Sequence, residues 1–377
     1  MSEGFKPILI AGADYSAAIK QPNPTWLALL EVLEGSGAAE LSAAASRNKK
    51  GTMQEKRNNF LHLRLTSLEN VGSEGLYQAL AETSPLRIGL DFPFGYPAPF
   101  LDWIRRRGAS QQRPARGNED TRGRRSPAGN EEAGKDTCEK LVCRETQPGV
   151  IACHDWQLTR ELASMPFSEL EQAVAEFART TKPEPLRLTD QLVSPKGTSP
   201  LHRINPGLLK MTWQGATLLL ALKAIGFRIS PFDQEDSNGA ATASKVMEIY
   251  PAALLKWLSL PHRRYKGTSA TAVQTREEIA SALARSSGMV LSPHKLHTVN
   301  SGRPCQLKLD IKPSLRHRCL ADDNALDGVI AAIGAAISLM DPPAVSPAIL
   351  EASPELSRQS HLVQREGWIY TPYLLKP

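Results

Sequence analysis

Six consecutive apolar residues, 8–13, stand directly before Asp14 near the start of the chain. Amphipathic helices place apolar residues every three or four positions, and half-exposed strands place them at every second position. A strand that is covered on both faces instead reads as one continuous apolar run, and such strands belong to sheets that are at least partly parallel. The run therefore predicts an α/β fold in which helices flank a partly parallel sheet.

The rest of the first hundred residues adds to this sheet. Segments rich in apolar residues predict further strands over 26–33, 60–65 and 86–90. A short helix is expected over 73–81, and the Ser- and Lys-rich stretch 42–59 is expected to be a loop. The predicted order is therefore three strands, a helix and a fourth strand.

The second half of the chain shows mainly helical patterns. One further strand is predicted over 245–250, leading directly into a helix. Helices are predicted over 167–179, 208–225, 251–258, 275–286 and 321–340.

An Arg-rich segment interrupts these patterns. The 377 residues carry 45 Lys and Arg against 39 Asp and Glu, a formal net charge of +6, and residues 105–140 alone contribute +4 of it. This segment has no Val, Ile, Leu, Met, Phe, Trp or Tyr, so it cannot offset the entropy of ordering by burying apolar surface. We expect a disordered insertion that divides one domain into 1–104 and 141–377, the latter with a helical insertion. The charge surplus marks this segment and gives no evidence about the core.

Cellular location is inferred from absences. No apolar run approaches the roughly 20 residues that span a bilayer, and residues 1–14 do not resemble a signal peptide. The five cysteines are therefore expected to be reduced thiols of a cytoplasmic protein without membrane association. Cys138, Cys143, Cys153 and His154 could bind zinc, but their spacing is not one of the usual patterns, so free thiols are the favoured interpretation.

Three predicted strands carry a carboxylate at or near their ends: Asp14, Asp91 and Glu248. Ligands of open α/β sheets bind outside the carboxyl ends of the strands, so side chains placed there tend to converge. Each carboxylate could instead be a turn or cap residue, which is the commoner role of Asp at a strand end.

The closing helix adds two more carboxylates, Asp323 and Asp327, which are four residues apart and so share one face. A position near the positive helix N-terminus accounts for Asp322 and Asp323 but less well for Asp327, which is next to the apolar run. Clustered carboxylates are costly without a cation. The set Asp14, Asp91 and Asp327, with Glu248 or Asp323 as a fourth ligand, therefore predicts a site for Mg²⁺ or Mn²⁺.

Several strings of the sequence together resemble a known family: ILIAGADYSAA, IGLDFPFGYP, LRLTDQLVSPKGTSPLHRINP, MEIYPAALLKWL, ALDGVIAAIGAAI and EGWIYTP. They are similar to domain-of-unknown-function family 429, which is described as predicted nucleases with an RNase H-like fold. The resemblance covers nearly the whole chain except 105–140. It implies a five-stranded mixed sheet with three antiparallel and two parallel strands, flanked by helices, with the insertion between strands four and five.

The resemblance also implies roles for the acidic residues. Asp14 would lie on the first strand and bridge two metal ions, while Asp91 on the fourth strand and Asp327 on the closing helix would each complete one. Glu248 on the fifth strand would be a fourth ligand or a nearby base. The expected activity is metal-dependent hydrolysis of a nucleic-acid phosphodiester by a two-metal mechanism.

Basic residues before the fifth strand could contact phosphate, namely Arg187, Lys196 and Arg203, although a solvated surface would look the same in sequence. Two other functions stay open. The chain could be an inactive RNase H-like module that binds nucleic acid or protein. It could also be an actin-like ATP-dependent phosphotransferase, since Asp14-Tyr15-Ser16 faintly resembles the first phosphate loop of those enzymes. A P-loop or dinucleotide enzyme is disfavoured because neither glycine motif is present.

Overall fold

The computed structural model describes residues 7–15, 24–33, 60–111, 154–202, 206–233, 243–285, 289–291, 305–339, 350 and 354–370. Three features expected from sequence lie outside these ranges: the loop 42–59, the cysteines of the possible zinc set, and Arg203.

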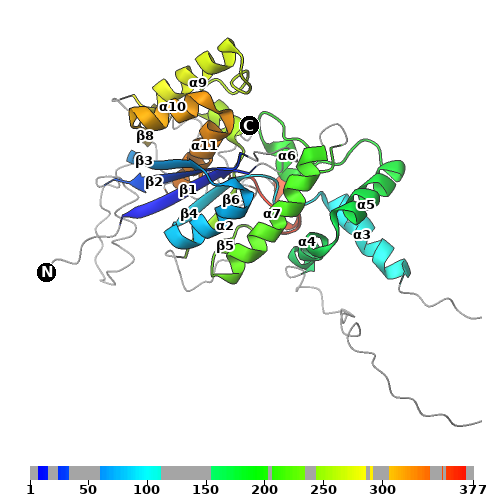
Figure 1. Cartoon of the computed structure of the whole chain (residues 1–377). Helices are drawn as coiled ribbons and strands as arrows, with labels where there is room; N and C mark the ends of the chain where they lie inside the picture. The colour runs from blue at the N-terminus through cyan, green and yellow to red at the C-terminus, as the bar shows by residue number, and fades with distance from the viewer. Residues whose placement is uncertain are drawn as a thin grey trace, which may run out of the picture.

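One mixed sheet of eight strands, in the order β5-β6-β4-β1-β2-β3-β8-β7, forms the centre of the fold (Figure 1). Its strands are β1 Ile8–Asp14, β2 Trp26–Val32, β3 Phe60–Asn70, β4 Arg87–Asp91, β5 Arg228–Ile229, β6 Lys245–Glu248, β7 Met289–Leu291 and β8 Cys305–Asp310. The expected number of five strands is therefore wrong. The three additional strands lie at the two edges, and β5 and β7 are too short to give a recognisable apolar pattern.

The five inner strands have the directions that the family resemblance implies. β1 pairs antiparallel with β2, and β2 pairs antiparallel with β3. On the other side, β1 pairs parallel with β4, and β4 pairs parallel with β6. Since parallel neighbours end at the same edge of a sheet, the carboxyl ends of β1, β4 and β6 are brought together.

Helices cover both faces of this sheet (Figure 1). One face packs against α8 (Pro251–Trp257), α9 (Ala270–Leu283), α10 (Pro313–Ala321) and α11 (Asp323–Ile337). The other face packs against α2 (Gly72–Thr83) and α7 (Pro206–Ala224). β1 supplies both cores, because Ile10 belongs to the first and Ala11 and Ala13 to the second. This two-sided burial is what the continuous apolar run predicts.

Helix α11 packs directly onto the backbone of β1 and β4. A Cβ atom on Gly12 would lie 2.0 Å from the amide nitrogen of Ala332, and one on Gly89 would lie 2.2 Å from the carbonyl oxygen of Ala331. Real side chains never approach so closely, so only glycine fits at these two strand positions. The Ala- and Gly-rich face of α11 provides the matching small residues on the helix side.

A second group of helices lies beside the sheet: α3 (Ala98–Gln111), α4 (His154–Ser164) and α5 (Phe167–Thr180) (Figure 1). They share an apolar cluster that includes Phe100 and Phe177. Because α3 continues to Gln111, the first seven residues of the expected disordered segment are helical, and its predicted start at Arg105 is wrong. Phe100 anchors the helix, and arginine continues a helix readily once it has started. Residues 112–140 lie outside the described ranges.

The predicted helix 321–340 is two helices. α10 ends at Ala321, and Asp322 has an extended backbone with φ −136° and ψ 126°. Its carboxylate then caps α11 by accepting a hydrogen bond from the amide of Asn324 at 2.8 Å.

The described ranges contain no helix long and apolar enough to cross a membrane. The remaining elements are short: α6 Leu188–Leu192, α13 Pro354–Ser357, η3 Ser360–Leu362 and α14 Val363–Glu366.

Candidate functional site

Asp14 and Asp91 are the last residues of β1 and β4, and they are direct partners in the parallel register. Neighbouring strands lie about 4.8 Å apart. Each aspartate follows its close-packing glycine, Gly12 or Gly89, by two residues, so strand alternation turns both carboxylates toward the face that α11 covers. The repeated Gly-x-Asp spacing thus places the two side chains together.

Asp327 approaches from the helix above. It is fully buried. A Cβ atom on the next residue, Gly328, would lie 3.6 Å from the amide nitrogen of Asp14. The first turns of α11 therefore lie over the end of β1. Asp14, Asp91 and Asp327, three of the acidic residues expected at the site, are brought together.

Burial and mutual repulsion raise the pKa values of these carboxyls. Desolvation is the largest cause for each of them. The negative charges of Asp91 and Asp327 add to it and hold the pKa of Asp14 well above its ordinary value. The pKa of Asp91 is raised to about 7, with Asp327 as the next cause after burial. A cluster of this kind requires a cation when all its members are ionised.

Lys266 is the cation that the structure places there. Its Nζ lies 2.7 Å from Oδ2 of Asp327, although 59% of the lysine side chain is exposed. Desolvation works against the charged amine, but attraction by the three carboxylates outweighs it and raises the pKa of Lys266. The ammonium therefore compensates part of the negative charge of the cluster.

Lys266 belongs to a segment that we call the basic loop, residues 262–266, with the sequence His-Arg-Arg-Tyr-Lys between α8 and α9. None of the residues expected at the site from the sequence belongs to it. A group of cationic residues between two predicted helices was the available signal. However, the contact from Tyr265 and Lys266 to Asp327 spans about sixty residues and leaves no local pattern.

The basic loop is fixed to the acidic cluster by several hydrogen bonds. The hydroxyl of Tyr265 donates to Oδ1 of Asp327 at 2.8 Å. The amide of Gly267 donates to Oδ2 of Asp323 at 2.8 Å. From α9, the buried Arg276 donates through Nη1 to the carbonyl oxygens of Tyr265 and Gly267, at 2.7 and 2.8 Å. Asp323, an expected metal ligand, thus lies beside the cluster but uses one oxygen to anchor the loop.

A pocket of about 190 Å³ separates the basic loop from the end of β4. Its walls combine the carboxylate of Asp91 with cationic and aromatic side chains. They are formed by Asp91, Tyr250, Pro251, Ala252, His262, Arg263, Arg264, Tyr265 and Lys266. Acidic and basic groups therefore face the same small volume.

Glu248 does not join the cluster. It is the register partner of Leu90, so alternation points it to the opposite face of the sheet from Asp91. Both of its oxygens bind the guanidinium of Arg187, at 2.8 and 2.7 Å, and the amide of Phe94 also donates to it. The expected roles of Glu248 as a ligand and of Arg187 as a phosphate contact are corrected. The two residues pair with each other, and each is at most 3% exposed.

This buried pair is part of a larger structural network. Arg187 also binds Asp190, at 2.9 Å from Nε and 2.8 Å from Nη2. Glu366 accepts hydrogen bonds from the amides of Ala98 and Leu188, at 2.5 and 2.6 Å. The network joins the end of the sheet to the C-terminal residues. Lys196, the other expected phosphate contact in the described ranges, is exposed on the loop after α6, and its role stays a prediction.

The donor chemistry of the acidic cluster suits a hard divalent cation. Carboxylate oxygens are the usual ligands of Mg²⁺ and Mn²⁺. Oδ2 of Asp327 is buried and, despite its ion pair with Lys266, accepts no hydrogen bond of regular geometry. Within the described residues, no three His, Cys, Asp or Glu side chains already form a ligand set. A metal ion bound at Oδ2 of Asp327 would compete with the ammonium of Lys266 for that oxygen.

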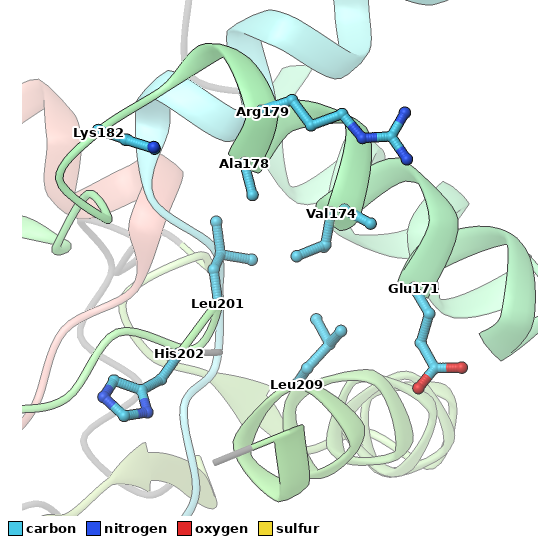
Figure 2. Close-up of a pocket in the computed structure, with 9 residues that line it drawn as sticks. Glu171, Val174, Ala178, Arg179, Lys182, Leu201, His202 and Leu209 are labelled. Carbon is cyan, nitrogen blue, oxygen red and sulfur yellow. The ribbon is translucent and has the colours of Figure 1, made fainter. Parts of the chain in front are cut away.

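A larger pocket, of about 610 Å³, lies between α5 of the second group of helices and α7 (Figure 2). Val174, Leu201 and Leu209 point toward its middle, and Glu171 and Arg179 extend from its rim (Figure 2). None of the clustered carboxylates lines it. Its size exceeds that of the pocket at Asp91, but it lacks that pocket's combination of facing acidic and basic groups.

Comparison of the chain with protein-family models finds no matching family, and no curated protein or solved structure matches it. The function of the protein therefore has to be inferred from the chemistry of the site itself.

Proposed function

We propose that the protein is a metal-dependent phosphodiester hydrolase with an RNase H-like fold. The observation that carries the proposal is the position of Asp14 and Asp91 as register partners at the carboxyl end of two parallel strands, with Asp327 of α11 above them. Three buried carboxylates with raised pKa values are costly to a fold, and such groups cluster at functional sites.

The strand arrangement supports the fold part of this proposal. The inner part of the sheet, β3-β2-β1-β4-β6, has three antiparallel and two parallel strands, which is the composition that the family resemblance implies. The residues on β1, β4 and the closing helix also agree with that resemblance. Glu248 departs from it, since it pairs with Arg187. Asp323, the other expected fourth ligand, binds the amide of Gly267, so the proposed ligand set consists of the three buried carboxylates.

Asp14, Asp91 and Asp327 would hold Mg²⁺ or Mn²⁺. A bound ion of this type stabilises negative charge that develops on a phosphoryl oxygen and lowers the pKa of a water molecule. Other residues of the chain position the carboxylates and balance their charge. α11 holds Asp327 over the strand ends, Tyr265 fixes the orientation of its carboxylate, and Lys266 compensates the cluster's charge before the ion binds.

The test is cleavage of DNA and RNA substrates in Mg²⁺ and in Mn²⁺ by the wild type and by Asp14→Asn, Asp91→Asn and Asp327→Asn. Each variant keeps the shape of the side chain and removes its charge. We expect losses of at least about 100-fold, because even groups that only support a metal ligand contribute 10–100-fold. Glu82→Gln, on the exposed side of α2, is the control and should cleave like the wild type. Full activity of Asp14→Asn and Asp91→Asn would contradict the assignment.

A further inference from the structure

Arg263 and Arg264 are exposed and have no partner within the described part of the chain. Both line the pocket that also contains Asp91. Arginines elsewhere near the site are satisfied, since Arg187 binds two carboxylates and Arg276 binds backbone carbonyls. Two unpaired guanidinium groups beside an acidic cluster constitute an available anion site, because arginine presents several donors in a fixed plane.

The backbone of the basic loop is held in an unfavourable shape. Arg264 has a φ of +63°, in the left-handed region that favours glycine. Such a conformation costs on the order of 1 kcal/mol or more and persists where surrounding contacts impose it. Here Tyr265 and Gly267 are fixed by Asp327, Asp323 and Arg276. The backbone of the loop is therefore held in place, and it fixes where both arginine side chains start relative to the carboxylates.

The size of the pocket limits what an anionic ligand can be. Sites that enclose a small molecule usually measure about 300–1,000 Å³. The pocket at Asp91 is about 190 Å³, which is too small to enclose a whole nucleotide. It can receive one phosphate group while the remainder of the ligand lies outside it, along the exposed side of the basic loop.

We propose that Arg263 and Arg264 bind one phosphate group of a nucleic-acid strand and so position the neighbouring phosphodiester at Asp14, Asp91 and Asp327. This inference rests on the proposed function for the identity of the reacting group. The binding site itself rests on the two unpaired arginines and on the small pocket that they share with Asp91. Both arginines act on binding and orientation, and neither is placed among the metal-binding residues.

The experiment measures binding without catalysis. A short fluorescein-labelled oligodeoxythymidylate is titrated with the full chain in EDTA, and its anisotropy is followed at several salt concentrations. The double variant Arg263→Gln/Arg264→Gln is compared with the wild type. The control Arg285→Gln/Arg358→Gln removes the same charge from two exposed arginines that do not line the pocket.

We expect the double variant Arg263→Gln/Arg264→Gln to bind the oligonucleotide at least about tenfold more weakly, because it loses the charge-assisted hydrogen bonds from the guanidinium groups to phosphate. The salt dependence should also flatten, by about 0.7 in log K against log salt for each phosphate contact that is lost. The control pair should stay within about twofold. Unchanged affinity and slope in the basic-loop variant would overturn the inference, as would an equal loss in the control pair.

Two further arms identify the ligand and separate this inference from the proposed function. Inorganic phosphate and thymidine monophosphate should compete far more weakly than the unlabelled strand, and competition at equal concentration would overturn the assignment to a strand. Asp14→Asn should keep its binding and lose cleavage. Loop-dependent binding without any cleavage by the wild type would count against the proposed function alone. Cleavage that persists in Arg263→Gln/Arg264→Gln with wild-type KM would count against this inference alone.

Discussion

The acidic cluster should make the metal-free protein less stable as the pH rises. Burial and the charge of Asp327 raise the pKa of Asp91 to about 7, although Lys266 opposes them. A carboxyl with a higher pKa in the folded chain than in the unfolded chain binds its proton more tightly when folded. Its contribution to stability is therefore greatest below about pH 4 and is lost progressively as the pH rises toward about 7.

The size of the effect follows from the same shift. The interval from the ordinary value of 3.8 to about 7, at 1.36 kcal/mol for each pKa unit, corresponds to a loss on the order of 4 kcal/mol above about pH 7. This is an upper bound for Asp91 alone, because Asp14 and Asp327 titrate in the same cluster. Asp91→Asn removes one charge at constant shape. We expect it to raise the free energy of unfolding by about 2 kcal/mol near pH 8 and to have no effect near pH 4.

Urea denaturation in EDTA between these two pH values measures the difference. Asp310→Asn is the matched control, since His62 and Lys308 outweigh a burial effect and lower the pKa of Asp310, so this variant should lose stability at neutral pH. Added Mn²⁺ should stabilise the wild type near pH 8 and stabilise Asp91→Asn much less. A variant Asp91→Asn that is less stable than the wild type near pH 8 would refute the electrostatic reasoning.

Three further perturbations test other parts of the structure. Gly12→Ala places a Cβ 2.0 Å from the backbone of Ala332 and should destabilise the protein by about 3 kcal/mol or more. Gly108→Ala has open space around it and should stabilise α3 by about 0.5–1 kcal/mol. Thermal melting of the two variants measures the difference. Arg264→Gly relieves the left-handed backbone and should raise the melting temperature while weakening oligonucleotide binding. Arg187→Met leaves Glu248 without its buried partner and should cost about 3–5 kcal/mol in urea denaturation, with circular dichroism as the check on folding.

The sequence predicted where the five inner strands lie because each contains closely spaced apolar residues, whereas their pairing directions were implied by the family resemblance. The same segments predicted that Asp14 and Asp91 stand at the ends of their strands. The edge strands β5 and β7 were missed because two or three residues give no periodicity. The break at Asp322 was missed because a single extended residue hardly alters a helical pattern.

The expectations about Glu248 and Arg187 were wrong because their roles depend on contacts between residues far apart in the sequence. Whether Glu248 faces Asp91 depends on the register of β6 against β4, and a shift by one residue reverses the face. Arg187 looks like a surface cation until its pairing with Glu248, sixty-one residues away, is known. Lys266 and Tyr265 reach Asp327 across a similar separation. Local patterns contain none of this information.

Two sets of carboxylates at the end of the sheet differ in how fast their cationic partners can leave. Glu248 and Asp190 are paired with Arg187, and Asp327 is paired with Lys266. Arg187 is 1% exposed and bound to two carboxylates, so its release requires the surrounding core to open, as slowly as a local unfolding event. Lys266 has most of its side chain in solvent, and rotamer changes of exposed side chains take picoseconds to nanoseconds. Displacement of Lys266 would therefore not limit the rate at which the proposed divalent ion enters at Asp327.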